Sequence, residues 1–188
     1  MKNVLSFALL FIASAAGADT PEPVRVETPP VEAAGRALLQ QYGSTFERIH
    51  SSREDSVETE EYVLQGETAE NWTQMLTYQR ISAAEPIAAD QYVALLKRHL
   101  HETPHRPRFR VLQQSKAAAL FGVHYPSSSS ADEQLGLVLV TVPDGKRPNE
   151  VHLIQFAVSP ARLPPDELEL QVKRWQARLQ SQAAAFAR

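Results

Sequence analysis

Three of the six histidines lie close together in the sequence, where a predicted helix ends. Neutral imidazole nitrogens bind zinc and copper, so His99, His101 and His105 form the candidate metal site of this chain. Residues two apart on a helix point in divergent directions, and the spacing matches no common ligand pattern. The alternative is that these histidines interact favourably with the C-terminal end of the helix dipole. A metal site would require the helix to fray after Leu100.

Residue patterns for nucleophilic catalysis or nucleotide binding are missing from the sequence. The chain has no cysteine and no Gly-x-Ser-x-Gly motif, and the serines at 127–130 form a low-complexity run. Its seven glycines form no phosphate-binding loop. We therefore expect no cofactor, and the sequence favours a protein that is not an enzyme.

Five glutamates are concentrated in one short region of the chain: Glu58, Glu60, Glu61, Glu67 and Glu70. Two of them would suit glycoside hydrolysis if their carboxyl groups faced each other across a cleft at a defined separation. The sequence does not fix such a separation. We expect instead that these residues form an acidic edge exposed to solvent.

Hydrophobic periodicity predicts seven strands and three helices. The predicted strands are 46–53, 57–64, 73–81, 108–115, 117–125, 135–142 and 151–158. The predicted helices are a short one that begins near Val31 and stops at Gly43, one over 89–102, and one that begins at Pro164-Pro165-Asp166. This order predicts an α+β protein, in which a mostly antiparallel sheet of about six to seven strands packs against two longer helices and a short N-terminal helix.

The two most apolar strands and the last helix are the expected core. Strands 135–142 and 151–158 are apolar on both faces and flank Pro143-Asp144-Gly145, so we predict a hairpin in the middle of the sheet. The last helix carries an apolar stripe made of Leu168, Val172, Trp175, Leu179 and Phe186. Trp175 is expected to anchor that helix in the core. His124 and His152 lie on predicted strands, and the sequence does not show whether they are neighbours.

The stretch from Tyr62 to Thr77, YVLQGETAENWTQMLT, resembles a pattern found in small secreted bacterial proteins, in which a Gly-Glu turn and then Glu-Asn-Trp-Thr lead from one strand to the next. The order of strands and helices is similar to the α/β sandwich of PsbP-like proteins. That resemblance implies a fold used for binding and assembly, and it transfers no catalytic or metal-binding residue. The turn residues Glu67, Glu70, Asn71 and Trp72 are the candidate surface for a ligand or partner, although Trp72 also suits a structural role that covers the sheet.

The N-terminus has the features of a secretory signal peptide. Lys2 precedes an apolar run of about 13 residues, shorter than the roughly 20 that a spanning helix needs, so we expect no stable membrane anchor. Ala16-Gly17-Ala18 provides small residues for cleavage before Asp19. We therefore predict a signal peptide over 1–18, a proline-rich extended tether over 19–30 and a single α+β domain over 31–188.

These observations predict a soluble envelope protein, periplasmic or secreted, that binds or assembles without catalysing a reaction. The formal charge of −3 and the lack of a basic run make nucleic acid an unsuitable partner. The expected partner is another envelope protein or a small apolar ligand. Two alternatives stay open: an envelope hydrolase that uses carboxylates and a histidine, and a weak metal-binding protein.

Overall fold

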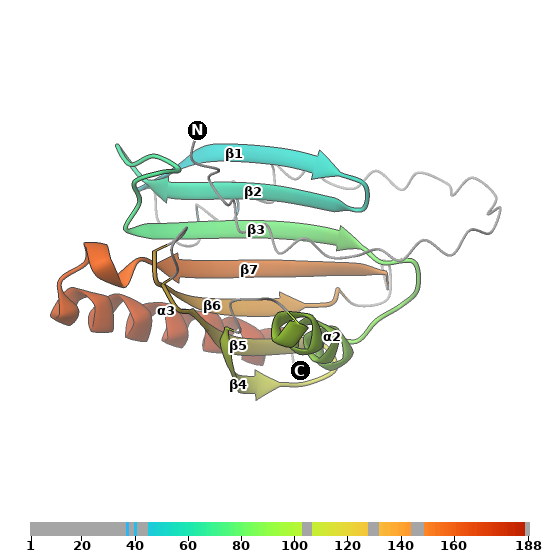
Figure 1. Ribbon diagram of the computed structural model, residues 1–188. Helices are drawn as coiled ribbons and strands as arrows, with labels where there is room; N and C mark the ends of the chain where they lie inside the picture. Colours follow the sequence, from blue (N-terminus) through green and yellow to red (C-terminus); the bar gives the residue numbers. More distant parts are fainter. Residues whose placement is uncertain are drawn as a thin grey trace.

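The computed structural model describes residues 45–102, 107–127, 132–143 and 149–186, together with the single positions Ala37 and Gln40. These residues form seven strands, two long helices and one short 3-10 helix (Figure 1). In chain order, the elements are β1 (Phe46–Glu54), β2 (Val57–Leu64), β3 (Gln74–Ser82), α2 (Ala89–Glu102), β4 (Arg108–Gln114), β5 (Ala118–Tyr125), β6 (Gln134–Thr141), β7 (Glu150–Val158), η1 (Pro160–Arg162) and α3 (Pro165–Phe186). The predicted α+β class, its mostly antiparallel sheet and its two longer helices are confirmed.

The seven strands form one sheet in the order β1-β2-β3-β7-β6-β5-β4, and every neighbouring pair is antiparallel. The chain first lays down β1 to β3 side by side. It then passes through α2 to the far edge of the sheet and returns through β4, β5, β6 and β7, so that the last strand pairs with β3 (Figure 1). The predicted pairing of β6 with β7 is confirmed, and both strands lie in the middle of the sheet.

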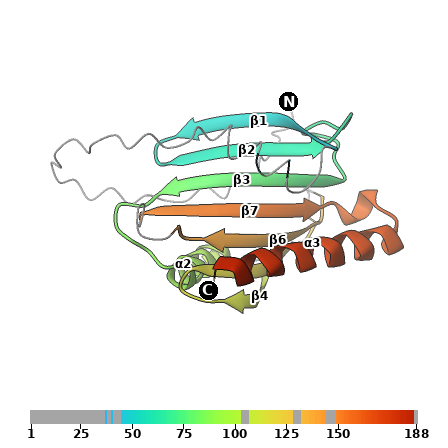
Figure 2. The ribbon, with the colours of Figure 1, turned by 180° about the vertical axis from the view of Figure 1, so that it is seen from behind.

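The two helices cover opposite faces of the sheet, as the two opposed views show (Figures 1 and 2). On one face, Leu96 and Leu100 of α2 pack in a buried cluster with Val138. On the other face, Trp175 and Leu179 of α3 pack in a second cluster that includes Leu139. Because adjacent residues of a strand point to opposite faces, β6 contributes Val138 to one cluster and Leu139 to the other. The central strands are therefore covered on both sides, as their sequence predicts.

The last helix follows the predicted stripe over most of its length. Trp175, Leu179 and Ala183 are buried, while Leu168 and Val172 are half-buried. The prediction is wrong for Phe186, whose exposed fraction is 47%. Ala183 is the last buried position of α3, and Phe186 lies beyond it, at the end of the helix, where it does not join the cluster formed by the sheet.

Several predictions for the N-terminal region fall outside the described residues. They are the signal peptide, the proline-rich tether and, apart from Ala37 and Gln40, the short helix that begins near Val31.

Candidate ligand-binding pocket

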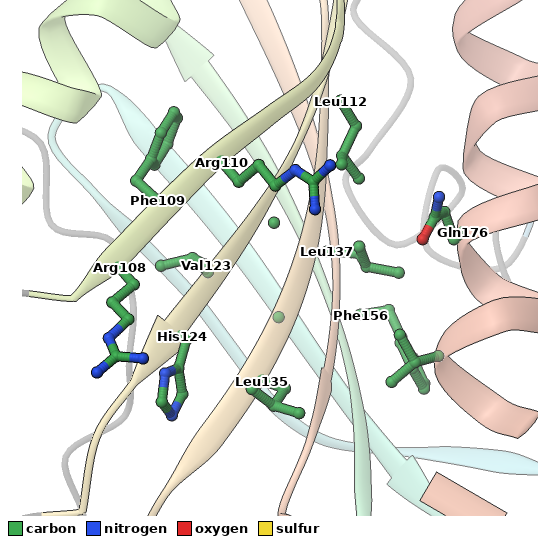
Figure 3. A pocket seen from close by; sticks show the side chains of 13 residues that line it. Arg108, Phe109, Arg110, Leu112, Val123, His124, Leu135, Leu137, Phe156 and Gln176 are labelled. Carbon is green, nitrogen blue, oxygen red and sulfur yellow. The ribbon is translucent and has the colours of Figure 1, made fainter. Parts of the chain in front are cut away.

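A pocket of about 280 Å³ lies between α3 and the half of the sheet formed by β4, β5 and β6 (Figure 3). Its floor includes the side chains of Leu135, Leu137 and Phe156, and its helical wall is formed by Val172 and Gln176, one turn apart on α3. Apolar side chains thus form most of its interior surface. A concave apolar site with a few polar groups at its edge is typical of sites that bind small molecules.

One position on the floor of the pocket has no side chain. Arg110, Gly122, Leu137 and Phe156 are register partners across four strands, so they form one row on the face that α3 covers. A Cβ atom added to Gly122 would come no closer than 3.9 Å to another heavy atom, the carbonyl oxygen of Gly136. A methyl group would therefore fit at this position, and a larger side chain would take up part of the pocket.

Trp175 holds the helical wall of the pocket in place. Its exposed fraction is 2%, and its ring stacks on Phe156 with 4.5 Å between ring centroids. Phe46 contacts the same indole edge-on, with 6.3 Å between centroids. The prediction that Trp175 anchors α3 in the core is confirmed. Since Phe156 also lines the pocket, the indole lies one ring away from any bound ligand.

Three basic or titratable side chains surround the opening of the pocket (Figure 3). Arg110 extends from β4 across the pocket toward Gln176, while Arg108 lies beside His124. Nε2 of His124 is 2.6 Å from Oε1 of Glu133. Among the described residues, neither Arg108 nor Arg110 has a carboxylate partner. The opening thus carries two guanidinium groups that are available to an anion.

A second polar cluster lies on the same face of the sheet, on β1, β2 and β3. Glu58 is paired in the sheet with Arg53 on one side and Arg80 on the other, and it forms an ion pair with each. Glu60 is fully buried and accepts hydrogen bonds from Nη1 of Arg48, at 3.1 Å, and from the Tyr62 hydroxyl. Arginines on the neighbouring strands therefore offset the buried negative charge.

This cluster corrects one prediction. Glu58, Glu60 and Glu61 are buried, so they do not form an acidic edge exposed to solvent. The physical reason is that β2 is the second strand of the sheet, between β1 and β3, and not its edge.

His152 takes part in a short chain of hydrogen bonds at the margin of this cluster. Its Nδ1 is 3.1 Å from the Tyr78 hydroxyl, and its Nε2 is 3.2 Å from a carboxylate oxygen of Glu150. Burial raises the pKa of Tyr78 to about 12, which disfavours a phenolate nucleophile. Because both nitrogens of the imidazole are engaged, a structural role suits His152 better than general base catalysis.

The turn between β2 and β3 holds the four residues predicted as a ligand or partner surface. The carboxylate of Glu67 accepts hydrogen bonds from the backbone N–H of Thr73, at 3.0 Å, and from its hydroxyl, at 2.6 Å. Arg162 donates to the carbonyl oxygen of Glu70, at 3.2 Å, and to Oδ1 of Asn71, at 2.8 Å. Glu67 and Asn71 thus fix the shape of this turn.

Two further observations bear on this surface. Glu70 is exposed and Trp72 is half-buried. Arg162 also forms an ion pair with Asp132, which joins the turn to the residues before β6. Binding of a partner at Glu67, Glu70, Asn71 and Trp72 stays a prediction.

The histidines predicted to bind metal lie on α2 and after it. His99 is half-buried and His101 is exposed, while His105 is outside the described residues. Within the part of the chain that the structure describes, no three side chains of His, Cys, Asp or Glu come together as a metal site. Metal binding by His99, His101 and His105 stays a prediction.

His124 and His152, which both lie on strands, are not neighbours. His124 is paired with Leu135 at the start of β6, and His152 is paired with Thr141 at its end. They therefore lie on different strands, at opposite ends of the strand between them.

Comparison with known proteins places the chain in a family. A protein-family model matches residues 36–183, a span that contains every strand, α2, the pocket and α3 up to its last three residues. The chain belongs to this family. No curated protein and no solved structure matches the chain, so the resemblance to PsbP-like proteins stays a prediction. None of the helices within 45–102, 107–127, 132–143 and 149–186 has both the length and the apolar character needed to cross a membrane.

Sequence reasoning did not find the pocket residues. The sequence pattern indicates only strand positions for Gly122, Leu135 and Leu137. It indicates the polar side of a half-exposed strand for Arg108 and Arg110. The available signal was a glycine inside an apolar strand, since such a glycine often marks the close approach of a ligand or another backbone.

Proposed function

We propose that this chain is an exported envelope protein that binds a small apolar molecule in the pocket beneath α3, without catalysing a reaction. The observation that supports this proposal most strongly is the mostly apolar pocket of about 280 Å³ beneath α3, with Gly122 on its floor. The pocket opens at an arginine-containing edge of the sheet, so a ligand with one polar end would have a route into it.

The test is a titration with 1-octanol, a neutral molecule small enough for the pocket. Binding is followed by the fluorescence of Trp175, in a Trp72→Phe background that removes the second indole. Gly122→Leu should weaken binding at least about tenfold, because its side chain takes the space of several methylene groups, each worth about 0.8 kcal/mol. Gly122→Ala is the matched control, since one methyl group leaves most of the pocket open.

Export is tested separately from binding. The protein recovered from the envelope fraction should begin at Asp19, after removal of residues 1–18. Intact Met1 on protein recovered from the cytoplasm would refute export and leave the pocket argument untouched.

A second candidate function, ester hydrolysis, is favoured by the His124–Glu133 contact at the opening of the pocket. A carboxylate that orients an imidazole is the arrangement used for general base catalysis, with water as the nucleophile. p-Nitrophenyl octanoate would place its acyl chain in the pocket and its carbonyl near His124. Hydrolysis above the uncatalysed rate that is lost in His124→Gln would support a hydrolase, whereas equal rates in both proteins would remove this candidate.

An assembly role at the turn between β2 and β3 needs a different experiment. Glu70→Lys reverses an exposed charge there, whereas Glu67→Lys would also remove the hydrogen bonds to Thr73. Retention of one envelope protein by the wild type, and its loss with Glu70→Lys, would support a partner surface.

A further inference from the structure

We infer that the ligand is a monocarboxylate of about eight to ten carbons, held with its carboxylate against Arg110 and Arg108. This inference rests on the proposed function and adds the chemical class of the ligand. The observation behind it is that two guanidinium groups line a pocket whose surface is otherwise mostly apolar (Figure 3).

The charge at the opening favours an anion. The chain carries more acidic than basic residues, and several of its arginines are already paired with acids. These pairs are Arg48–Glu60, Arg53–Glu58, Arg80–Glu58 and Arg162–Asp132. Arg108 and Arg110, in contrast, have no carboxylate partner among the described residues, although both border an apolar pocket. A guanidinium presents a planar set of donors that matches a carboxylate.

The nearby acid does not cancel this charge. Glu133 directs its carboxylate to Nε2 of His124, at 2.6 Å, so the imidazole occupies one of its oxygens. The opening therefore carries two positively charged guanidinium groups and one negatively charged carboxylate. A ligand with a positive end would meet both guanidinium groups, whereas a ligand with a negative end would bind them.

The volume of the pocket limits the size of the apolar body. A space of 280 Å³ corresponds to about nine water molecules at about 30 Å³ each. A methylene group is close to a water molecule in size, so a chain of about eight to ten carbons, the carboxylate carbon included, fills the pocket. Leu135, Leu137, Phe156 and Val172 would surround it, and Arg110 would lie over its polar end.

The experiment compares three ligands of equal length, octanoate, 1-octanol and octylamine, by fluorescence titration and calorimetry with the full chain. We expect octanoate to bind about tenfold more tightly than 1-octanol, because its carboxylate accepts charge-assisted hydrogen bonds from the arginines. Octylamine should bind more weakly than both, because its ammonium group cannot accept these bonds. Each methylene removed from octanoate should weaken binding about fourfold.

Three variants assign the charge effect to the opening. Arg110→Gln, and to a smaller extent Arg108→Gln, should weaken octanoate binding toward that of 1-octanol and leave 1-octanol binding unchanged. Arg98→Gln is the matched control, because it also removes an exposed charge, from α2 on the other face of the sheet. Far-UV circular dichroism checks that each variant folds.

The outcomes separate the inference from the proposed function. If 1-octanol binds as tightly as octanoate, or if Arg110→Gln affects both equally, the carboxylate assignment is overturned while the apolar pocket stands. If none of the three ligands binds, or if Gly122→Leu binds them like the wild type, the proposed function itself fails.

Discussion

The glycines at positions 122 and 136 lie on neighbouring strands and face opposite sides of the sheet, so the same substitution should affect them differently. A Cβ atom at Gly122 would meet nothing closer than 3.9 Å. A Cβ atom at Gly136 would lie 2.9 Å from Cγ1 of Val123, a buried valine in the cluster that α2 covers. Neither backbone adopts the left-handed conformation that requires glycine.

The expected free energies follow from these contacts. Replacing glycine by alanine restricts the unfolded chain and stabilises a protein by about 0.4–1 kcal/mol where the backbone permits it. At Gly136 the added methyl must also displace a β-branched side chain that has little freedom at χ1, which costs about 1–3 kcal/mol. Because the unfolded-state effect is common to both variants, Gly122→Ala should be more stable than Gly136→Ala by about 1–3 kcal/mol.

Urea and thermal unfolding of the two variants and the wild type provide the assay. For a domain of this size, 1 kcal/mol moves the midpoint of thermal unfolding by about 2–4 °C. We expect Gly122→Ala to melt above the wild type and Gly136→Ala below Gly122→Ala. A Gly122→Ala variant that melts below the wild type would refute the placement of Gly122 over an open pocket, and equal stabilisation of both variants would refute the close contact of Gly136 with Val123.

Three further predictions concern the rest of the fold. Arg48→Met leaves the buried carboxylate of Glu60 without its guanidinium and should lower the free energy of unfolding by about 1–3 kcal/mol, and Arg48→Met/Glu60→Leu should recover part of that loss; an unchanged urea midpoint in the single variant would contradict the pairing. Burial raises the pKa of Tyr78 and of Tyr125 to about 12, above the ordinary value of 10, so the stability that each contributes is complete below pH 10 and is lost as the pH rises toward 12. Each tyrosine should lower the free energy of unfolding by about 2–3 kcal/mol between these pH values. Tyr78→Phe should therefore flatten the pH dependence of that free energy, measured by unfolding in urea; identical pH profiles for the variant and the wild type would count against the burial of Tyr78. Trp175→Ala should lower the free energy of unfolding by about 3–5 kcal/mol, and a loss below 1 kcal/mol would show that α3 is not anchored there.

The arrangement of strands and helices could be predicted because hydrophobic periodicity is a local property. Helix 89–102 was predicted with the same first and last residues that the structure shows, and strand 57–64 likewise. The two most apolar strands lie mid-sheet, and each contributes side chains both to the cluster that α2 covers and to the cluster that α3 covers.

The pocket and the buried acids could not be predicted, because both depend on which strands are neighbours. Gly122 makes an opening only when Arg110, Leu137 and Phe156 share its row, and that row joins segments far apart in the sequence. Glu60 is buried because Arg48 of the adjacent strand reaches its carboxylate, a contact that depends on the register of β1 with β2.

The position of a bound ligand tests the central claim most directly. In an NMR experiment with selectively methyl-labelled protein, 1-octanol should give intermolecular nuclear Overhauser effects to Leu135, Leu137 and Val172, and these signals should disappear in Gly122→Leu. Contacts confined to methyl groups on the face covered by α2, such as those of Leu96 and Val138, would contradict the account, because they would place the ligand on the wrong side of the sheet.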